Sequence, residues 1–274
     1  MKRTLFFLAV FASLVFASSG SVRFRQPIDQ TVQNGGTADL GIIGPGQTVE
    51  LTIGTDAGVA SALERDKNAD WDYFEVIGDL LPIGWSKKDA KIYDNPLTAF
   101  VTAAKDAKDG EYYFNVRVRD DYEEVSPLVF RVKVRISRDV LSLSSSPLEQ
   151  YAGVGTPAVY RLELWNRGSA SDVFLVTVSG LPAAWDYSQK VYVPHEGRSS
   201  FFFEAGASEP GGYDLEFKAV SLSSDAISAT DKSRLVAEAT LIQDLKAAAN
   251  GVLLFPSAQQ AVVAILGYLA NNFG

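Results

Sequence analysis

Residues 72–85 read DYFEVIGDLLPIGW, and residues 172–185 read DVFLVTVSGLPAAW. At an offset of 100 residues the two stretches share Asp, Phe, Val, Leu, Pro and Trp in the same order. Phe74 and Val76 occupy alternate positions, as one buried face of a β-strand requires, and Phe174 and Val176 repeat this spacing in the second copy. Proline lacks an N–H and ends the strand, and the tryptophan after it buries a large area. The fixed offset favours duplication of one β-module over chance.

A second correspondence supports the duplication. Gly110-Glu111-Tyr112 and Gly211-Gly212-Tyr213 lie 101 residues apart, and each opens a late strand of its module. Such a tyrosine resembles the tyrosine corner of immunoglobulin-like sandwiches. Antibody domains place a cysteine two residues later, where this chain has Phe114 and Leu215. We therefore expect plain apolar packing in place of the disulfide.

Residues 111–119 and 128–136 predict the clearest hairpin, because apolar and polar residues alternate along both segments. One face of this hairpin is apolar and the other is basic. The basic positions are Arg117, Arg119, Arg131, Lys133 and Arg135. This face is suited to anionic lipid head groups or an acidic protein neighbour. An ordinary solvated strand face that discourages aggregation is the alternative.

The spacing of strands and turns predicts an all-β chain of two tandem immunoglobulin-like β-sandwiches with a short apolar helical C-terminal segment. Residues 55–71 have no counterpart in the second module, so we expect an inserted short helix or loop there. The expected boundaries are a signal peptide at 1–19, sandwiches at 21–136 and 149–242, a linker at 137–148 and the apolar segment at 243–274.

Residues 150–241 resemble the α-galactosidase-associated, immunoglobulin-like repeat of exported archaeal and bacterial surface proteins, and residues 22–136 resemble it more loosely. The residues that carry the resemblance are Gly155, Tyr160, Leu162, Leu164, Asn166, Gly168, Asp172, Phe174, the run Gly180-Leu181-Pro182, Trp185, Val193-Pro194 and Gly212-Tyr213. The family usually has a small residue or proline where His195 stands. These repeats serve as spacer and adhesion modules, so the resemblance implies fold and location more than activity.

Composition excludes several kinds of chemistry. The 274 residues include 47% hydrophobic side chains, enough for packed cores, and the formal net charge is −8. An acidic chain without a long basic run is a poor nucleic-acid binder. The absence of cysteine excludes disulfides, thiolate metal sites and cysteine nucleophiles.

The N-terminus has the order of a secretory signal. Lys2 and Arg3 precede an apolar run from Leu5 to Phe16, and small residues follow. The run is short for a bilayer span. We expect export and removal of residues 1–19, with an uncleaved anchor as the alternative.

The C-terminal segment is predicted to associate with a membrane. Ser257 and Gln260 form a capping-box pattern, so a helix should begin near Ala258. A helix over 258–271 is only about 20 Å long, short for a bilayer of about 30 Å. A re-entrant hairpin, docking on a membrane protein, or packing on the second sandwich are the alternatives to a span. The apolar positions are Leu253, Leu254, Phe255, Val262, Val263, Ile265, Leu266, Tyr268 and Leu269.

Catalytic patterns are missing from the sequence. The single histidine, His195, is expected to be an exposed turn residue, and no nucleophile elbow, phosphate loop or zinc-protease motif occurs. Acidic residues around Asp70 and Asp121 are expected to be solvated loop charges, with calcium binding as the alternative. Phe202 should share the outer face of its strand with Glu204, where it packs at a module junction, stacks on a sugar or stays exposed. We predict no enzyme activity and no cofactor.

These observations favour a non-catalytic, exported, cell-surface structural or interaction protein, anchored in or on a membrane by its C-terminus. One alternative is a carbohydrate-binding module of an envelope enzyme system. Another is an extracytoplasmic accessory subunit of a membrane complex. The expected partners are a membrane or membrane protein and also glycans or surface-layer proteins, but not nucleic acid.

Overall fold

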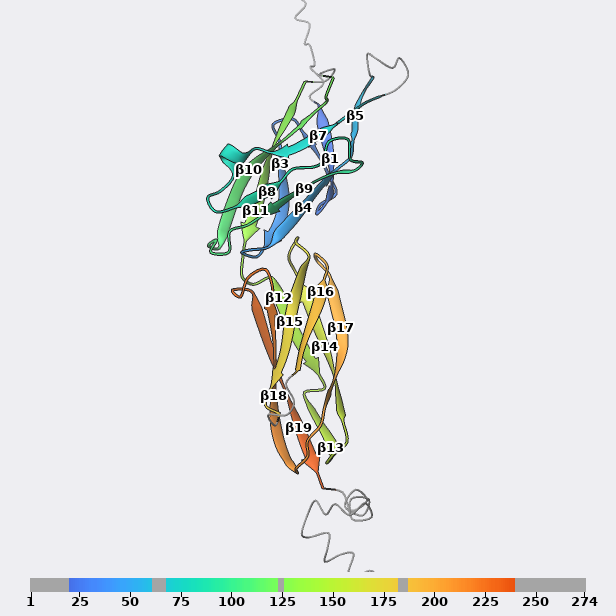
Figure 1. The fold of residues 1–274 in the computed structure, drawn as a ribbon, viewed down its shortest axis with the longest axis vertical. Helices are drawn as coiled ribbons and strands as arrows, with labels where there is room; N and C mark the ends of the chain where they lie inside the picture. The colour runs from blue at the N-terminus through green and yellow to red at the C-terminus, as the bar shows by residue number, and fades with distance from the viewer. Residues whose placement is uncertain (1–19, 61–67, 123–125, 182–186, 240–274) are drawn as a thin grey trace, which may run out of the picture.

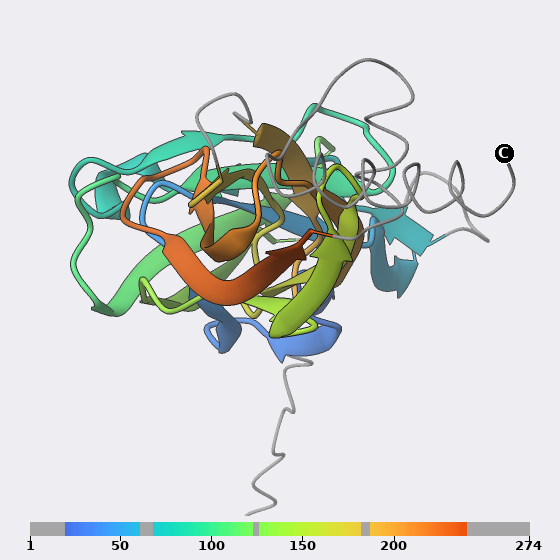
Figure 2. The same cartoon turned by 90° about the horizontal axis from the view of Figure 1, so that it is seen from below.

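The computed structural model describes residues 20–60, 68–122, 126–181 and 187–239. These residues form two β-modules stacked end to end, with the first module at the top of Figure 1 and the second below it. Viewed along the long axis, the second module lies in front of the first (Figure 2). We call the part from β1 to β11 module 1 and the part from β12 to β19 module 2.

The secondary structure is nearly all β. One short 3₁₀ turn, η1 (Gly78–Leu80), lies in module 1, and the described residues contain no α-helix. The strands of module 1 are β1 (Ser21–Gln26), β2 (Gln30–Gln33), β3 (Thr37–Ile43), β4 (Thr48–Ile53), β5 (Asp56–Ala60), β6 (Asn68–Asp70), β7 (Tyr73–Val76), β8 (Ser86–Lys88), β9 (Leu97–Thr102), β10 (Gly110–Arg119) and β11 (Leu128–Ile136). The strands of module 2 are β12 (Leu141–Ser146), β13 (Glu149–Gly153), β14 (Ala158–Asn166), β15 (Asp172–Ser179), β16 (Tyr187–Val193), β17 (Arg198–Ala205), β18 (Gly211–Ser221) and β19 (Ser228–Glu238).

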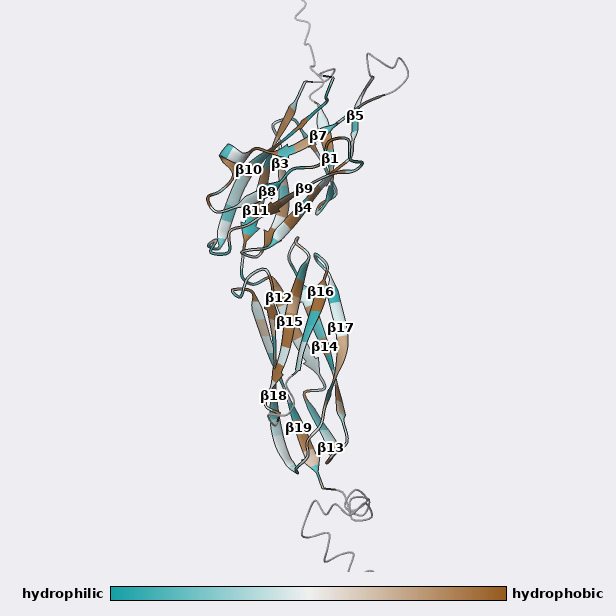
Figure 3. Cartoon of the chain, viewed as in Figure 1, coloured by the Kyte–Doolittle hydropathy of each residue, from teal (hydrophilic) through white to brown (hydrophobic). Residues whose placement is uncertain are grey.

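Module 1 packs a five-stranded sheet, β2-β1-β4-β9-β8, against a four-stranded sheet, β3-β11-β10-β7. The apolar residues that alternate along the longer strands meet between the sheets, and Figure 3 shows brown and teal bands along many of these strands. Phe24 contacts Phe74 and Phe130 edge-on, with ring centroids 6.3 and 5.9 Å apart. Trp85 packs against Tyr112 at 5.4 Å. Among the described residues, Trp71, which the sequence analysis did not single out, is the largest fully buried side chain.

Module 2 repeats the arrangement with a three-stranded sheet, β12-β14-β17, and a five-stranded sheet, β13-β19-β18-β15-β16. Its core contains Tyr160, Phe174 and Phe217, all fully buried. In both modules one early strand runs parallel to the last strand, β3 with β11 and β13 with β19, while the other pairs are antiparallel. The two modules therefore share one plan, as the repeated sequence predicts.

The predicted hairpin and the predicted tyrosine corners are confirmed. Strands β10 and β11 pair from Gly110 opposite Ile136 to Val118 opposite Leu128. The Tyr112 hydroxyl donates to the Lys108 carbonyl at 3.0 Å, and the Tyr213 hydroxyl donates to the Glu209 carbonyl at the same distance. Each tyrosine therefore closes the loop before its strand.

One predicted boundary is corrected, and one predicted insertion is described in part. The linker predicted over residues 137–148 is shorter, because Leu141–Ser146 forms β12 and pairs with β14 in module 2. Alternating Leu141, Leu143 and Ser145 point inward, and the serine-rich composition of the segment hid this strand from the sequence analysis. In the insertion predicted at 55–71, Asp56–Ala60 and Asn68–Asp70 form the paired strands β5 and β6, and residues 61–67, between them, lie outside the described residues.

Several sequence predictions fall outside the described residues. They are the signal peptide at 1–19, the core position predicted for Trp185, and the apolar segment from residue 243, including the side chains predicted to contact a membrane. Within the part of the chain that the structure describes, no helix is long and apolar enough to cross a bilayer.

Candidate functional site

The junction between the modules is built around the tight turn from Gly44 to Gln47, which joins β3 to β4. Gly46 has φ of +74°, a left-handed conformation that favours glycine. A Cβ atom there would lie 2.5 Å from the carbonyl oxygen of Ser223 in module 2. A Cβ atom on Gly44 would lie 2.3 Å from Cδ1 of Ile227. Glycine therefore lets the module 1 turn touch the β18–β19 turn directly.

A buried hydrogen-bond network crosses this contact. Gln47 is fully buried, and its Nε2 donates to Oδ2 of Asp172 at 2.8 Å. Its Oε1 accepts the backbone N–H of Gly44 at 2.7 Å. The Asp172 carboxylate also accepts the hydroxyls of Ser221 at 2.6 Å and Ser223 at 2.9 Å. Because both buried groups are satisfied, the network stabilises one arrangement of the two modules.

Backbone and apolar contacts reinforce the junction. The Ser169 N–H of module 2 donates to the Ile42 carbonyl of module 1 at 2.7 Å. Ala170 packs into the core of module 1, and Ile42 packs against the core of module 2. This reciprocal packing, together with the four-residue connection Ser137–Val140, holds the two modules as one unit.

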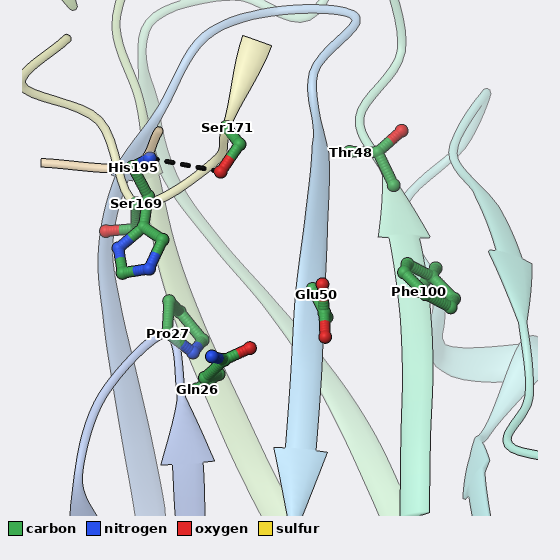
Figure 4. A pocket seen from close by; sticks show the side chains of 8 residues that line it. All are labelled: Gln26, Pro27, Thr48, Glu50, Phe100, Ser169, Ser171 and His195. Carbon is green, nitrogen blue, oxygen red and sulfur yellow. Dashed lines mark hydrogen bonds between the residues drawn. The ribbon is translucent and has the colours of Figure 1, made fainter. Parts of the chain in front are cut away.

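A cleft of about 240 Å³ lies at the junction, with walls from both modules. Figure 4 shows Gln26, Pro27 and Glu50 of module 1 near His195, Ser169 and Ser171 of module 2. The lining residues are Gln26, Pro27, Thr48, Glu50, Phe100, Ser169, Ser171 and His195. One half-buried aromatic ring among amide, hydroxyl, carboxylate and imidazole groups suits a small hydroxylated ligand.

His195 lies in this cleft, so the expectation of a simply exposed turn residue is refined. The side chain is half-buried, and Nδ1 is buried without a hydrogen-bond partner among the described residues. The Ser171 hydroxyl accepts the backbone N–H of His195 at 3.0 Å, not a proton of the ring. The contact is thus a turn contact and not the serine–imidazole hydrogen bond of a nucleophilic site.

The predicted basic face lies on β10 and β11 and carries carboxylate partners. Arg117 Nε lies 2.7 Å from Glu75 on β7, and Lys133 Nζ lies 2.8 Å from Glu111 and 3.4 Å from Asp39 on β3. Glu111 belongs to β10 itself, whereas the neighbouring strands β7 and β3 bring Glu75 and Asp39 to the hairpin, which the alternation within 111–136 cannot reveal. Acidic neighbours weaken the attraction of this face for an anionic surface.

The remaining basic side chains lie over aromatic rings or beside the same carboxylates. The Arg119 guanidinium lies 3.7 Å from the ring centre of Tyr73, and the Arg131 guanidinium lies 4.1 Å from that of Tyr113. Arg135 lines a shallow pocket with Lys133 and Glu111. Hydrogen bonds from Lys133 and Tyr113 lower the pKa of Glu111, and the hydrogen bond to Glu111 raises the pKa of Lys133.

The acidic positions at the far end of module 1 bind tyrosine hydroxyls. Tyr73 and Tyr93 donate to the two carboxylate oxygens of Asp121, at 2.8 and 2.6 Å. These bonds lower the pKa of Asp121 and raise the pKa of Tyr93 to about 12. Across the described residues, no group of three histidine or acidic side chains is placed to hold a metal ion.

Phe202 lies on the outer face of β17, as predicted, with 70% of its surface exposed. It does not line the junction cleft. The residues that sequence reasoning missed are Gln47, Ser221 and Ser223. The one sequence feature that pointed to this network was the aspartate repeated in residues 72–85 and 172–185. Its second copy, Asp172, accepts hydrogen bonds from Gln47 and Ser221.

Comparisons with known proteins give fold-level likeness at low identity. No protein-family model and no curated protein matches the chain. The CARDB domain of a Pyrococcus furiosus protein in complex with di-metal ions is 17% identical over 35% of this chain and 86% of that one, with a TM-score of 0.27. Chimeric titin Z1Z2 carrying a decorin peptide is 12% identical over 81% and 100%, with a TM-score of 0.36. A Listeria innocua β-glucosidase in complex with glucose is 13% identical over 36% and 16%, with a TM-score of 0.26.

These comparisons give no information about activity. The immunoglobulin-like character of the two modules is visible in their own paired sheets and tyrosine corners. The specific resemblance to the α-galactosidase-associated repeat is not confirmed by the comparisons and stays a prediction.

Proposed function

We propose that this chain is a non-catalytic interaction protein of the cell exterior that holds two sandwiches as one stiff, extended unit. The observation that carries the proposal is the buried bond between Gln47 and Asp172, which fixes one module on the other. A stiff unit holds a binding surface at a set distance from its point of attachment. This matches the spacer and adhesion role implied by the sequence resemblance to exported repeats.

Export and attachment are part of the same proposal. The charged, apolar and small-residue order of residues 1–19 supports export. The uncharged stretch after Lys246 supports association with a membrane or membrane protein. The same export signal suits an extracytoplasmic accessory subunit of a membrane complex.

The test is detergent phase partitioning of the full chain and of a version that ends at Leu245. We expect the full chain in the detergent phase and the shortened chain in the aqueous phase. If both stay aqueous and melt at the same temperature, membrane attachment is wrong. If both stay aqueous and the shortened chain melts earlier, the segment belongs to the folded core. Recovery of a membrane protein with the full chain alone would favour the accessory-subunit role.

The cleft favours carbohydrate binding as the second candidate function. Phe100 is half-buried beside Thr48, Glu50 and Gln26, an arrangement suited to stacking and hydrogen bonding with a sugar ring. A glycan array with the wild type and the Phe100→Ala variant tests it. Phe202→Ala is the matched control, because it removes an exposed phenylalanine outside the cleft. Binding that is lost with Phe100 and kept without Phe202 supports this function. The absence of any bound glycan rejects it.

A further inference from the structure

Strand β17 has an open edge in module 2. It pairs with β14 from Arg198 opposite Trp165 to Ala205 opposite Ala158. In the described part of the chain it pairs with no second strand, and it is the longest strand at a sheet edge there. Figure 1 shows β17 along the outer margin of module 2.

Several other strands among the described residues are met on their outer side by a neighbouring strand or side chain. In module 1, β8 covers one side of β9. The edge of β7 is met by Asp89, whose carboxylate accepts the Val76 N–H at 2.8 Å, and by Ala90, whose N–H donates to the Phe74 carbonyl at 3.0 Å. In module 2, the Asp231 carboxylate accepts the Ser145 N–H on β12 at 2.6 Å. An open edge that is long and free of proline is a template for another strand.

The side chains of β17 fit a particular kind of strand. Its outward positions are Arg198, Ser200, Phe202 and Glu204, all exposed. The two charges of opposite sign lie at the two ends, and the middle is uncharged. Phe202 exposes 70% of its surface in this centre. The strand is therefore complementary in charge to its own reversed copy.

We propose that β17 pairs antiparallel with β17 of a second copy of this chain, about a two-fold axis at Phe201. In this register Arg198 lies opposite Glu204 of the partner subunit, and the axis repeats the pair at the other end. Ser200 lies opposite Phe202 of the partner subunit, so the exposed ring is flanked by a neighbouring strand. The two three-stranded sheets join into one continuous sheet.

The existing contacts of Arg198 leave room for this pairing. Arg198 Nη1 lies 2.6 Å from Glu163, and its guanidinium lies 4.5 Å from the Trp165 ring centre. A guanidinium has five N–H donors, so it can keep Glu163 and meet a second carboxylate. Glu204, on the same face, has no ion pair in the described residues. Pairing supplies that carboxylate with a cation.

The test is sedimentation equilibrium of the full chain in a detergent that keeps apolar C-terminal segments apart. We expect a monomer–dimer equilibrium in the wild type. Arg198→Glu and Glu204→Arg should each weaken association by about 10-fold or more, because each places like charges opposite one another twice. The double variant should return close to the wild type, since it restores both opposite pairs. Arg161→Glu, on the covered strand β14, is the matched control and should leave association unchanged.

Several results would overturn the proposal. One is a wild-type chain that stays monomeric at every concentration. Another is an association constant that the single charge reversals leave unchanged, or that Arg161→Glu lowers as much as they do. A third is a double variant that associates no more tightly than the single variants. Thermal melting of each variant, followed by circular dichroism, separates loss of pairing from loss of folding. Glu204→Arg gives the clean single reversal, because it removes no ion pair within the described chain.

Discussion

Asp72 and Asp172 hold the same place in the two copies of the repeat but have different surroundings. Asp172 is buried at the junction, where its carboxylate accepts bonds from Gln47, Ser221 and Ser223. Asp72 is half-buried at the far end of module 1 and accepts the Asp121 N–H at 2.9 Å. Burial and the nearby acidic side chains raise the pKa of Asp72. The place of a module in the array, more than the repeat sequence, therefore decides what this aspartate does.

The corresponding ends of the two modules also have different surroundings. At the junction, module 1 covers the loops of module 2 that face it (Figure 1). At the far end of module 1, the β5–β6 hairpin lies where module 2 has a short turn, and Tyr73 and Tyr93 bind Asp121. One copy thus carries an added hairpin, and the other carries a neighbouring module.

Truncation of a core phenylalanine should destabilise the two modules by similar amounts, and this loss of stability is the largest effect we expect. Phe74 and Phe174 are both fully buried at matching positions. Phe74→Ala and Phe174→Ala should each lower the free energy of unfolding by about 3–5 kcal/mol, through lost burial and the cavity left behind. Calorimetry of the two variants measures the losses. A loss below about 1 kcal/mol in one of them would show that the copies do not share a core plan.

Replacement of the two matching aspartates by alanine should lower the free energy of unfolding by different amounts. Asp172→Ala leaves the buried Gln47 amide and two serine hydroxyls without their acceptor, so it should cost about 1.5–3 kcal/mol. Asp72→Ala should cost less than about 1 kcal/mol, because Asp72 is half-buried and lies among like charges. Urea unfolding of both variants gives the comparison. Equal losses would contradict the position effect described above.

Alkaline pH should reveal a smaller difference. Burial raises the pKa of Tyr160 to about 12, and module 1 has Trp71 and phenylalanines as its large fully buried aromatic residues. The unfolded chain ionises this tyrosine near pH 10, so its stability contribution is present below that pH and is lost as pH rises through about 12. The loss is about 1.4 kcal/mol near pH 11.

Tyr160→Phe removes this titration, although it also removes the hydroxyl bond to the Arg234 carbonyl. The variant should therefore be less stable than the wild type near neutral pH, and the gap should narrow between pH 9 and about 11. Urea unfolding at several pH values measures the gap. A constant gap would mean that Tyr160 ionises at its ordinary pKa in the folded chain.

The sequence predicted what depends on local pattern. Alternation in residues 111–136 predicted the β10–β11 hairpin, and Gly-x-Tyr predicted both tyrosine corners. It missed what depends on distant strands. Glu75 and Asp39 approach the basic face only through sheet pairing. Gln47 meets Asp172 across 125 residues of chain, and nothing in a Gly-Pro-Gly-Gln turn indicates which surface it will touch.

The parallel pairing of β13 with β19 has a mechanical consequence. Chain enters module 2 at the junction and leaves it at the opposite end, after Glu238 (Figure 1). Tension between the two ends would slide β13 and β19 along each other, so their five paired positions, from Glu149 with Arg234 to Gly153 with Glu238, would bear the load together. A ladder loaded lengthwise does not open one bond at a time. The same topology that completes the sandwich thus makes module 2 suited to transmitting a pull along its axis.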